Sequence, residues 1–271
     1  MKATILVENT TSRSDLTPEY GLSIHLSADG ESLLMDTGQN DALFANAPLL
    51  GVDLTVLDHI VLSHGHFDHA GGLGRLLLRV KKPHLWAHEN VGDAHMRAKK
   101  GNVVFIGCHL NKESVVFHPV RGTTRITENV FALEISIEER DPQFVHTPAH
   151  LVMPLEGGAF ETDPFRDDIS LVVKGEHGIS VILGCAHAGV VNILEKVSRT
   201  FGTKAFHAVI GGMHLGDCPE EFVDRVTSAL AERFQVDVWR PCHCTGIHSA
   251  WKLATKAGNV EWAGVGTILE L

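Results

Sequence analysis

One hexapeptide constrains this chain more than any other feature: HGHFDH at residues 64–69, directly after a short apolar segment. Imidazole nitrogens and carboxylate oxygens are the donors that hold Zn²⁺, Fe or Mn²⁺ in proteins. In an extended backbone His64 and His66 point to the same side, so both can reach one ion. Asp68 and His69 lie past the bend and can face a second ion. A solvated loop that is His-rich by chance is the competing interpretation, and four ligands at this spacing disfavour it.

One short motif does not close a coordination shell, so further ligands are expected at the ends of later strands, where α/β sheets form their sites. Four places in the second half of the chain qualify. They are the pair Asp167-Asp168 and three segments after apolar strands, which contain Cys185 with His187, then His214, then His243.

The hydrophobic pattern predicts short strands that alternate with helices. Strands are expected at 4–7, 22–26, 32–35, 59–62, 85–87, 170–173, 179–183, 208–210, 236–239 and 265–269, and helices at 41–50, 73–80, 190–201, 219–234 and 246–257. No repeat, low-complexity run or linker divides the chain. Two strand-rich halves, each with helices, indicate a layered α/β sandwich in a single domain over residues 1–271.

Residues from about 91 to 166 break this regularity. Their apolar pieces, at 103–106, 114–117 and 130–135, are interrupted by five prolines. We expect strands plus a long irregular loop, and such loops inside a compact domain often form lids or binding loops. This variable segment is therefore the candidate lid, and His146 and His150 are candidates for lining it.

The amino-acid composition limits the kinds of molecule that this protein is expected to bind. Lys and Arg number 23 against 33 Asp and Glu, a net charge of −10, and nucleic acids and anionic membranes are bound by basic surfaces, so neither is an expected partner. No apolar stretch approaches the roughly 20 residues of a membrane helix, and the start lacks the pattern of a signal peptide. Five cysteines are too few for a disulfide framework, which favours a cytoplasmic protein with reduced thiols. The oligomeric state is not determined by these features.

The hexapeptide, with Asp36-Thr37-Gly38 upstream, resembles the metallo-β-lactamase superfamily, whose fold is a four-layer αββα sandwich. The later segments GCAHAG (184–189), GGMHL (211–215) and CHCTG (242–246) resemble one branch of it. That branch is the metal-dependent hydrolases that include 7,8-dihydropterin-6-methyl-4-(β-D-ribofuranosyl)-aminobenzene-5′-phosphate synthase. The resemblance extends from about residue 6 to 271 and is weakest over residues 91–166.

The resemblance implies a role for each matching position. The first ion would be bound by His64 and His66 and the second by Asp68 and His69, with His187 at the later strand end that completes the site and His243 on the second ion. Asp36 would lie behind the ligands and orient the histidine loop, because a ligand imidazole needs its other nitrogen fixed by a hydrogen bond.

One position departs from the superfamily pattern. Many members have a bridging Asp directly after the glycine of the second-half strand, where this chain has Cys185. The bridging carboxylate is then absent, supplied by Asp167 or Asp168, or replaced by His187. This weakens the transfer of lactamase or phosphodiesterase activity. Cys185 itself is expected as a buried thiol beside the ligands.

Together these features predict a metal-dependent hydrolase with one or two divalent ions, zinc by default, with manganese or iron fitting the same donors. Asp68 is the candidate for taking a proton from water, and its substrate is expected to be a phosphorylated small molecule. His214 is either a substrate-facing acid or base or a residue packed at a strand end.

Three competing functions use the same residues. In a dihydropterin-type synthase, which is a transferase, the metal helps pyrophosphate to leave while another nucleophile attacks. A non-hydrolytic redox or sensor module would hold the metal without hydrolysis. A nuclease of the superfamily is disfavoured by the net charge of −10 and by the lack of a basic cluster.

Overall fold

Two mixed β-sheets form the centre of the chain, and a computed structural model describes all 271 residues. The first sheet has the order β17-β1-β2-β3-β4-β5-β8. Its strands are β1 (Lys2–Val7), β2 (Ser23–Ala28), β3 (Glu31–Met35), β4 (His59–Val61), β5 (His84–His88), β8 (Val116–Val120) and β17 (Ile268–Glu270). The sheet is antiparallel from β17 to β3 and parallel from β3 to β8.

The second sheet has the order β16-β15-β14-β13-β10-β9. Its strands are β9 (Thr123–Arg125), β10 (Val130–Glu134), β13 (Ile169–Gly175), β14 (Gly178–Leu183), β15 (Ala205–Gly211) and β16 (Gln235–Pro241). Strands β14, β15 and β16 are parallel, and the last three residues of β14 are buried completely, as in a sheet covered on both faces.

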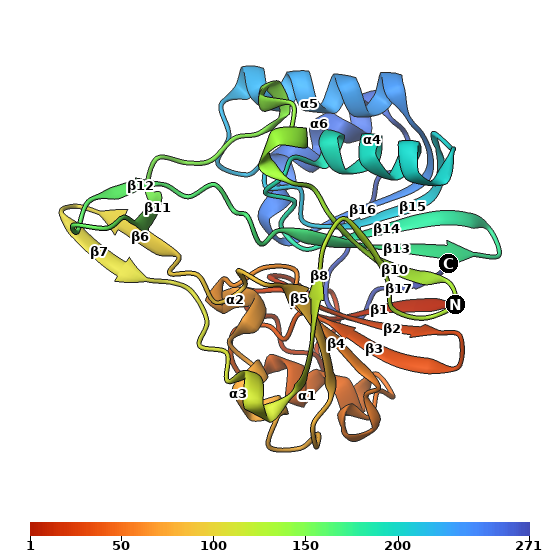
Figure 1. Cartoon of the computed structure of the whole chain (residues 1–271). Coiled ribbons are helices and arrows are strands. Elements are labelled where there is room, and N and C mark those ends of the chain that lie inside the picture. The colour runs from red at the N-terminus through yellow and green to blue at the C-terminus, as the bar shows by residue number, and fades with distance from the viewer.

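Helices cover the outer face of each sheet, which gives four layers in the order αββα (Figure 1). The first sheet is covered by α1 (Ala42–Leu49), α2 (Phe67–Ala70) and α3 (Leu73–Leu76), and the second by α4 (Val190–Phe201), α5 (Glu220–Arg233) and α6 (Ile247–Lys256). Five single 3₁₀ turns lie at Leu54–Val56, Lys112–Ser114, Ile137–Glu139, Pro142–Phe144 and His243–Thr245. This architecture confirms the αββα sandwich expected from the sequence.

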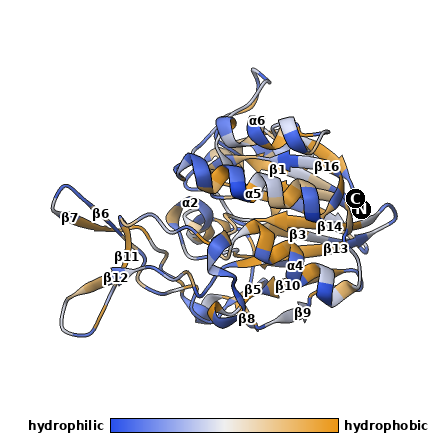
Figure 2. Cartoon of the chain, turned by 90° about the horizontal axis from the view of Figure 1, so that it is seen from above, coloured by the Kyte–Doolittle hydropathy of each residue, from blue (hydrophilic) through white to orange (hydrophobic).

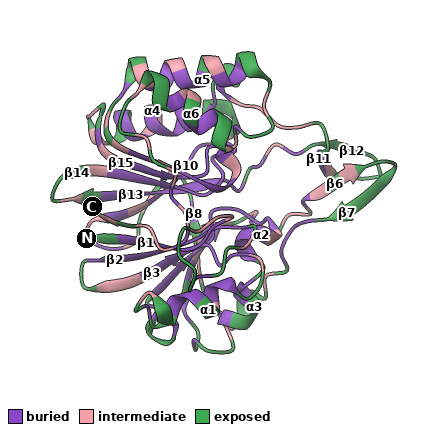
Figure 3. Ribbon diagram, turned by 180° about the vertical axis from the view of Figure 1, so that it is seen from behind, coloured by how far each residue is buried: buried purple, intermediate pink, exposed green.

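The apolar spacing of the helices accounts for their packing. In α4, Ile193, Leu194 and Val197 are buried on one face, and Gly202 ends the helix in the left-handed conformation at φ 71°. A separate apolar cluster, which includes Leu171 and Ile182, fills the space between the two sheets. The buried residues therefore follow the strands and the inner helix faces, while the outer helix faces are exposed (Figure 3).

A third, four-stranded sheet projects from one side of this sandwich, and we call it the arm (Figure 2). Its order is β12-β11-β6-β7, formed by β6 (Met96–Lys99), β7 (Asn102–Phe105), β11 (Leu151–Pro154) and β12 (Phe160–Thr162). Of the stretch between residues 91 and 166, the expected strand pieces correspond to β7, β8 and β10, and residues 135–150 form an irregular connection with two 3₁₀ turns. The arm as a separate sheet was not expected. The pairing of β6 with β11 joins segments that are distant in the chain, so no local pattern reveals it.

The arm is attached to the sandwich at α2. The backbone N–H of Phe67 donates to the carbonyl of Ile106 (2.9 Å), and Ile106, Leu151 and Phe165 form a small buried cluster against Phe67. The position of the arm is therefore tied to the loop that carries the hexapeptide.

Two helices differ from the expected ones. α3 ends at Leu76 rather than at residue 80, although Val80 is still buried in the core beneath it, and Leu78 lies 86% exposed. α2 was not expected, because its four residues are too few to show a helical period. No helix has the length and apolar character needed to span a bilayer, and all five cysteines carry free thiols.

The packing between the sheets can be tested with one pair of substitutions. We expect Leu171→Ala to lower the free energy of unfolding by about 3 kcal/mol, because Leu171 is fully buried and its truncation leaves a cavity. Leu78→Ala, at an exposed leucine, is the control and should change it by no more than about 0.5 kcal/mol. Denaturant titrations of both variants measure the two values, and equal losses would contradict the layer assignment.

Candidate metal centre

The carboxyl ends of the parallel strands in the two sheets meet at one edge of the sandwich. Ser63 follows β4, and Gly184 follows β14. A Cβ on Gly184 would lie 2.2 Å from Oγ of Ser63, so only glycine allows this approach. The backbone N–H of Ile169 donates to the carbonyl of Ser63 at the same junction (2.8 Å). The segments after β4, β14, β15 and β16 are thereby brought to one place.

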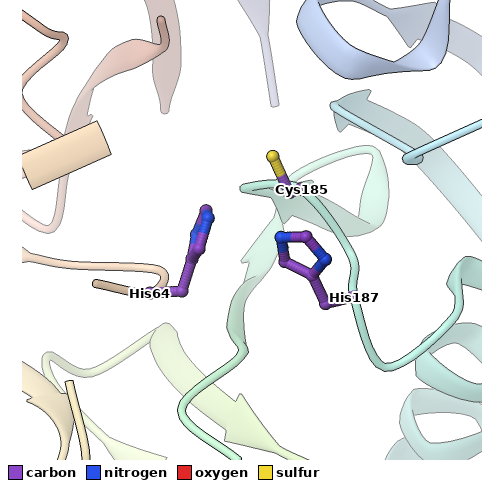
Figure 4. Close-up of side chains that lie close together, drawn as sticks. All are labelled: His64, Cys185 and His187. Carbon is purple, nitrogen blue, oxygen red and sulfur yellow. The ribbon is translucent and has the colours of Figure 1, made fainter. Parts of the chain in front are cut away.

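A first group of donors consists of His64, Cys185 and His187, whose ligand atoms lie within 4.8 Å of one another. Figure 4 shows the two rings and the sulfur facing a common space from two separate loops. The ring of His66 adjoins this group, with its centroid 4.6 Å from that of His64 and 5.3 Å from that of His187.

His64, His66 and His187 share an unusual property. The Nε2 atom of each is buried and has no hydrogen-bond partner. Burial and neighbouring imidazoles hold the pKa of His64 and His187 well below the ordinary value, and burial lowers the pKa of His66 to about 3. Buried polar atoms are normally paired, so these three unpartnered nitrogens fit a metal ion, with those of His64 and His187 in the first group and that of His66 beside it.

A second group consists of His69, Cys185 and His243, again within 4.8 Å. The Nε2 atoms of His69 and His243 lie 3.2 Å apart, and Sγ of Cys185 lies 3.1 Å from Nε2 of His69. Oδ2 of Asp68 lies 3.3 Å from Nε2 of His243. Cys185 belongs to both groups and so lies between them.

Asp36 orients both groups from behind. Nδ1 of His69 donates to one of its carboxylate oxygens (2.7 Å), so that Nε2 faces the second group. The other oxygen accepts from the backbone N–H of Ser63 (2.7 Å). The Ser63 hydroxyl donates to Asp36 (2.7 Å) and accepts from Nδ1 of His64 (2.9 Å). The structure thus places Asp36 where the orienting role expected from the sequence requires it.

His243 is fixed in a similar way by a different segment. Its Nδ1 donates to Oδ1 of Asn9 (3.0 Å), and its backbone N–H donates to Oε1 of the buried Glu8 (2.8 Å). Its Nε2 is thereby left to face Asp68 and His69. The two residues that directly follow β1 therefore hold His243 in place.

The charge at the second group favours a cation. Burial lowers the pKa of His69, but Asp36 and Asp68 outweigh this effect and raise it to about 9. The buried carboxylates therefore attract positive charge to the space between His69 and His243. Imidazole nitrogen, carboxylate oxygen and a thiol are the donor types that divalent zinc accepts, so the residues present fit a metal centre with two positions.

Asp167 and Asp168 lie in neither group. Oδ2 of Asp167 accepts from the backbone N–H of Gly65 (2.7 Å), and Oδ2 of Asp168 accepts from that of Ala188 (3.0 Å). Burial raises the pKa of Asp168 to about 6. Each carboxylate supports a loop that carries ligands. Cys185, which was expected only as a buried thiol beside the ligands, lies between the two groups.

His95 is an orienting residue that the sequence pattern does not reveal. Its buried ring lies between Asp163 (2.6 Å from Nδ1) and Asp167 (3.2 Å from Nε2). Burial lowers its pKa, but the two carboxylates dominate and raise it to about 10. The charged ring holds Asp167 against the hexapeptide loop. No spacing links His95 to either aspartate, because they lie far apart in the chain.

Phe165 is a second residue that orients a donor of the site and that the sequence pattern does not reveal. Its ring stacks on His187, with centroids 3.6 Å apart and an interplanar angle of 3°, and meets His66 edge-on at 5.1 Å. The buried Arg140 donates to the carbonyls of Pro164 and Phe165 (2.8 Å each) and so holds the backbone at φ 48°. Phe165 covers the first group with apolar surface and restricts the tilt of His187.

A cavity of about 390 Å³ opens over both groups, and His66, Asp68, Cys185 and His243 line it. His214 also lines it, with its ring centroid 4.3 Å from that of His187, and burial lowers the pKa of His214 to about 4. His214 thus borders the cavity, as the substrate-facing interpretation requires, and its role stays a prediction.

Three further residues, His146, His150 and Cys244, lie near the site, and two of them line the cavity. His150 lines the cavity, whereas His146 packs near Phe222, with ring centroids 5.4 Å apart. Cys244 also lines the cavity and accepts from the backbone N–H of His214 (3.3 Å). Arg97 of β6 and Leu151 of β11 also line the cavity, so it is formed by the sandwich on one side and by the arm on the other.

The amino-acid sequence is similar to one protein family and to individual proteins of known sequence. The family model described as "Metallo-beta-lactamase superfamily" matches residues 16–191. The 7,8-dihydropterin-6-methyl-4-(beta-D-ribofuranosyl)-aminobenzene-5′-phosphate synthase of Methanocaldococcus jannaschii is 30% identical over 245 residues, which cover 84% of this chain and 82% of that protein. An uncharacterized protein of the same organism is 27% identical over 98% of both chains.

Among solved structures, a protein described as a metal-dependent hydrolase of the beta-lactamase superfamily superposes with a TM-score of 0.85. It is 27% identical in sequence, and the match covers 100% of this chain and 99% of the other. The likeness therefore includes the arm as well as the sandwich.

We expect His66→Ala to reduce bound metal and activity together, because its Nε2 has no other partner to satisfy it. Elemental analysis of protein purified without added metal measures the first quantity. His248→Ala, on the exposed surface of α6, is the control and should leave metal content unchanged. Full metal content in His66→Ala would show that the site is assigned wrongly.

The position of Cys185 predicts a larger effect than that of another buried cysteine. We expect Cys185→Ser to weaken metal binding by at least about tenfold, since even the loss of an orienting partner behind a ligand costs about 10- to 100-fold. Cys108→Ser is the matched control, because a hydroxyl there can keep the bond to the Val91 carbonyl. Titration with a competing chelator measures both affinities, and equal values would exclude Cys185 from the coordination.

Proposed function

The chain belongs to the metallo-beta-lactamase superfamily, and from this we propose that it is a metal-dependent hydrolase of a phosphorylated small molecule, with two divalent ions in its active site. The single observation that carries the proposal is that Cys185 is shared by two groups of buried donors. Two adjacent ions can hold both the attacking and the leaving oxygen of a phosphate ester.

The first ion would be held by His64, His66 and His187, and the second by Asp68, His69 and His243, with Cys185 between them. The unpartnered Nε2 atoms of the first group and the carboxylate of the second support this division. A thiol among imidazoles favours zinc over manganese, while the nitrogen and oxygen donors also suit manganese or iron.

Bound divalent ions would supply the Lewis acidity that activates water and polarises a phosphate or pyrophosphate oxygen. The residues of the chain do the rest. Asp68 lines the cavity beside His243 and is the group placed to take a proton from the attacking water. His214 faces the same cavity beside His187 and is placed to exchange a proton with the leaving group. Phe165 keeps water away from the back of the first group.

A synthase reaction is the second candidate, and the named relative supports it because the similarity covers 84% of this chain. In such a transferase the leaving group is pyrophosphate, and a second organic substrate attacks instead of water. The donors and the cavity serve both reactions, so the products decide between them.

A redox or sensor module without catalysis has less support, because the synthase and the metal-dependent hydrolase that match most of this chain are named as enzymes. A net charge of −10 supports a small-molecule substrate over a nucleic acid. We place the protein in the cytoplasm, where its five free thiols stay reduced.

Metal analysis and a substrate screen test the proposal together. We expect about two equivalents of zinc, manganese or iron per chain, and hydrolysis of at least one compound among phosphate esters, cyclic phosphodiesters and pterin pyrophosphates. Removal of the metal with a chelator should abolish turnover, and added zinc or manganese should restore it. Turnover that survives complete metal removal would contradict the proposal, and products joined to an added amine or aniline would favour the synthase.

His214 provides a separate prediction. We expect His214→Gln to keep its metal but to lower kcat by about 100-fold on the substrate found in the screen, because a proton-transfer group is lost. His248→Gln, which removes an exposed imidazole, should leave kcat unchanged. An unaltered kcat in His214→Gln would return His214 to the role of a packed residue.

A further inference from the structure

Arg97 lies on β6 of the arm and lines the cavity above the metal centre. It is the only Lys or Arg side chain that does so. Its side chain takes part in no hydrogen bond and no ion pair, whereas the exposed Arg121 and Arg166 both have such partners. A guanidinium offers five donors in a planar fork, and here all five are available to a ligand.

The backbone of Arg97 is held firmly although its side chain is free. β6 is an inner strand of the arm, so Arg97 is paired with Val104 of β7 on one side and with Leu151 of β11 on the other. Leu151 belongs to the small buried cluster that joins the arm to α2. The arm therefore presents Arg97 at a fixed place over the metal centre.

His95 strengthens this attachment. It lies two residues before Arg97, and its buried ring is fixed between Asp163 and Asp167. Asp167 in turn accepts from the backbone N–H of Gly65 in the hexapeptide loop. The loop that carries metal ligands and the strand that carries Arg97 are thus linked by a continuous chain of hydrogen bonds.

Positive and negative side chains lie at different places around the cavity. The other charged side chains that line it, Asp68 and Asp217, are carboxylates, and Asp68 belongs to the metal centre. Lys99 and Lys100 follow at the tip of the β6–β7 hairpin, exposed and without ion pairs, so this hairpin is basic within an acidic chain, whereas the β11–β12 hairpin carries the exposed Glu156 and Glu161. An anion that approaches the cavity is therefore attracted to two separate places, the metal ions and the arm.

We propose that Arg97 forms an anion subsite that binds a second, non-reacting phosphate monoester of the substrate. This inference rests on the proposed function, because the reacting group of the same substrate must lie at the metal centre. A cavity of about 390 Å³ is far larger than a phosphate ion, so a molecule that reaches the ions has room to reach the arm as well. A phosphate monoester carries nearly two charges at neutral pH and matches the guanidinium fork.

The test uses alkanediol bisphosphates from propanediol to hexanediol and the monophosphates of the same length, each titrated calorimetrically into the metal-loaded protein. We expect at least one bisphosphate to bind about 10- to 100-fold more tightly than its monophosphate, the ratio typical of a charge-assisted hydrogen-bonded pair. Arg97→Gln should remove this preference and leave the affinity for the monophosphate and the metal content unchanged. Arg97→Lys, which keeps the charge but loses the fork, should retain part of the preference.

Lys99→Gln is the matched control. Lys99 lies on the same strand, is also exposed and does not line the cavity, so its loss should change each affinity by no more than about twofold. Because Arg97 has no partner in the protein, its replacement should also leave the thermal unfolding temperature unchanged.

Each outcome is decisive. A bisphosphate preference that survives in Arg97→Gln, or the absence of any preference in the unaltered protein, would overturn the subsite. A preference that depends on Arg97 but persists after metal removal would support the subsite and contradict the two-metal function. Monophosphate binding that requires metal but is the same with and without Arg97, together with no bisphosphate preference, would support the function and reject the subsite.

Discussion

The buried carboxylate of Asp36 is the interaction on which the arrangement of this protein depends. It accepts hydrogen bonds from His69 and from both the backbone and the hydroxyl of Ser63. A buried carboxylate without such donors would be costly, so the network persists only if β3, β4 and the hexapeptide loop keep their relative positions. Through Ser63 the same carboxylate sets the ring of His64. One side chain thus orients donors of both metal groups.

The second half of the chain completes what Asp36 begins. Gly184 lets β14 approach Ser63, which delivers Cys185 into the space between the two groups of histidines. A thiol at this position supplies a single soft donor where a carboxylate would supply two hard ones. If Cys185 binds the ions as proposed, its sulfur would favour zinc more than a bridging carboxylate would.

The proposed metal centre and the proposed anion subsite lie in two different parts of the structure. The edge of the sandwich carries the two groups of donors, Asp68 and His214, whereas the arm carries Arg97, with His150 directly before β11. The two parts are joined by the packing of Ile106, Leu151, Phe165 and Phe67 and by the bonds of His95. If Arg97 binds an anion as proposed, this joint would set the separation between that anion and the metal groups.

The sequence by itself indicated a layered α/β sandwich and a candidate metal-binding hexapeptide, because alternating strands, helical spacing and a six-residue motif are local features, and the resemblance of that motif to a known superfamily implied the order αββα. The β2–β3 hairpin, α4 and α5 lie within a few residues of their expected ranges. The tertiary structure alone placed Cys185 between the groups, joined His95 to Asp163 and Asp167, stacked Phe165 on His187 and built the arm that presents Arg97. These contacts join residues that are distant in the chain, and only the closure of the loops between them during folding brings such residues together.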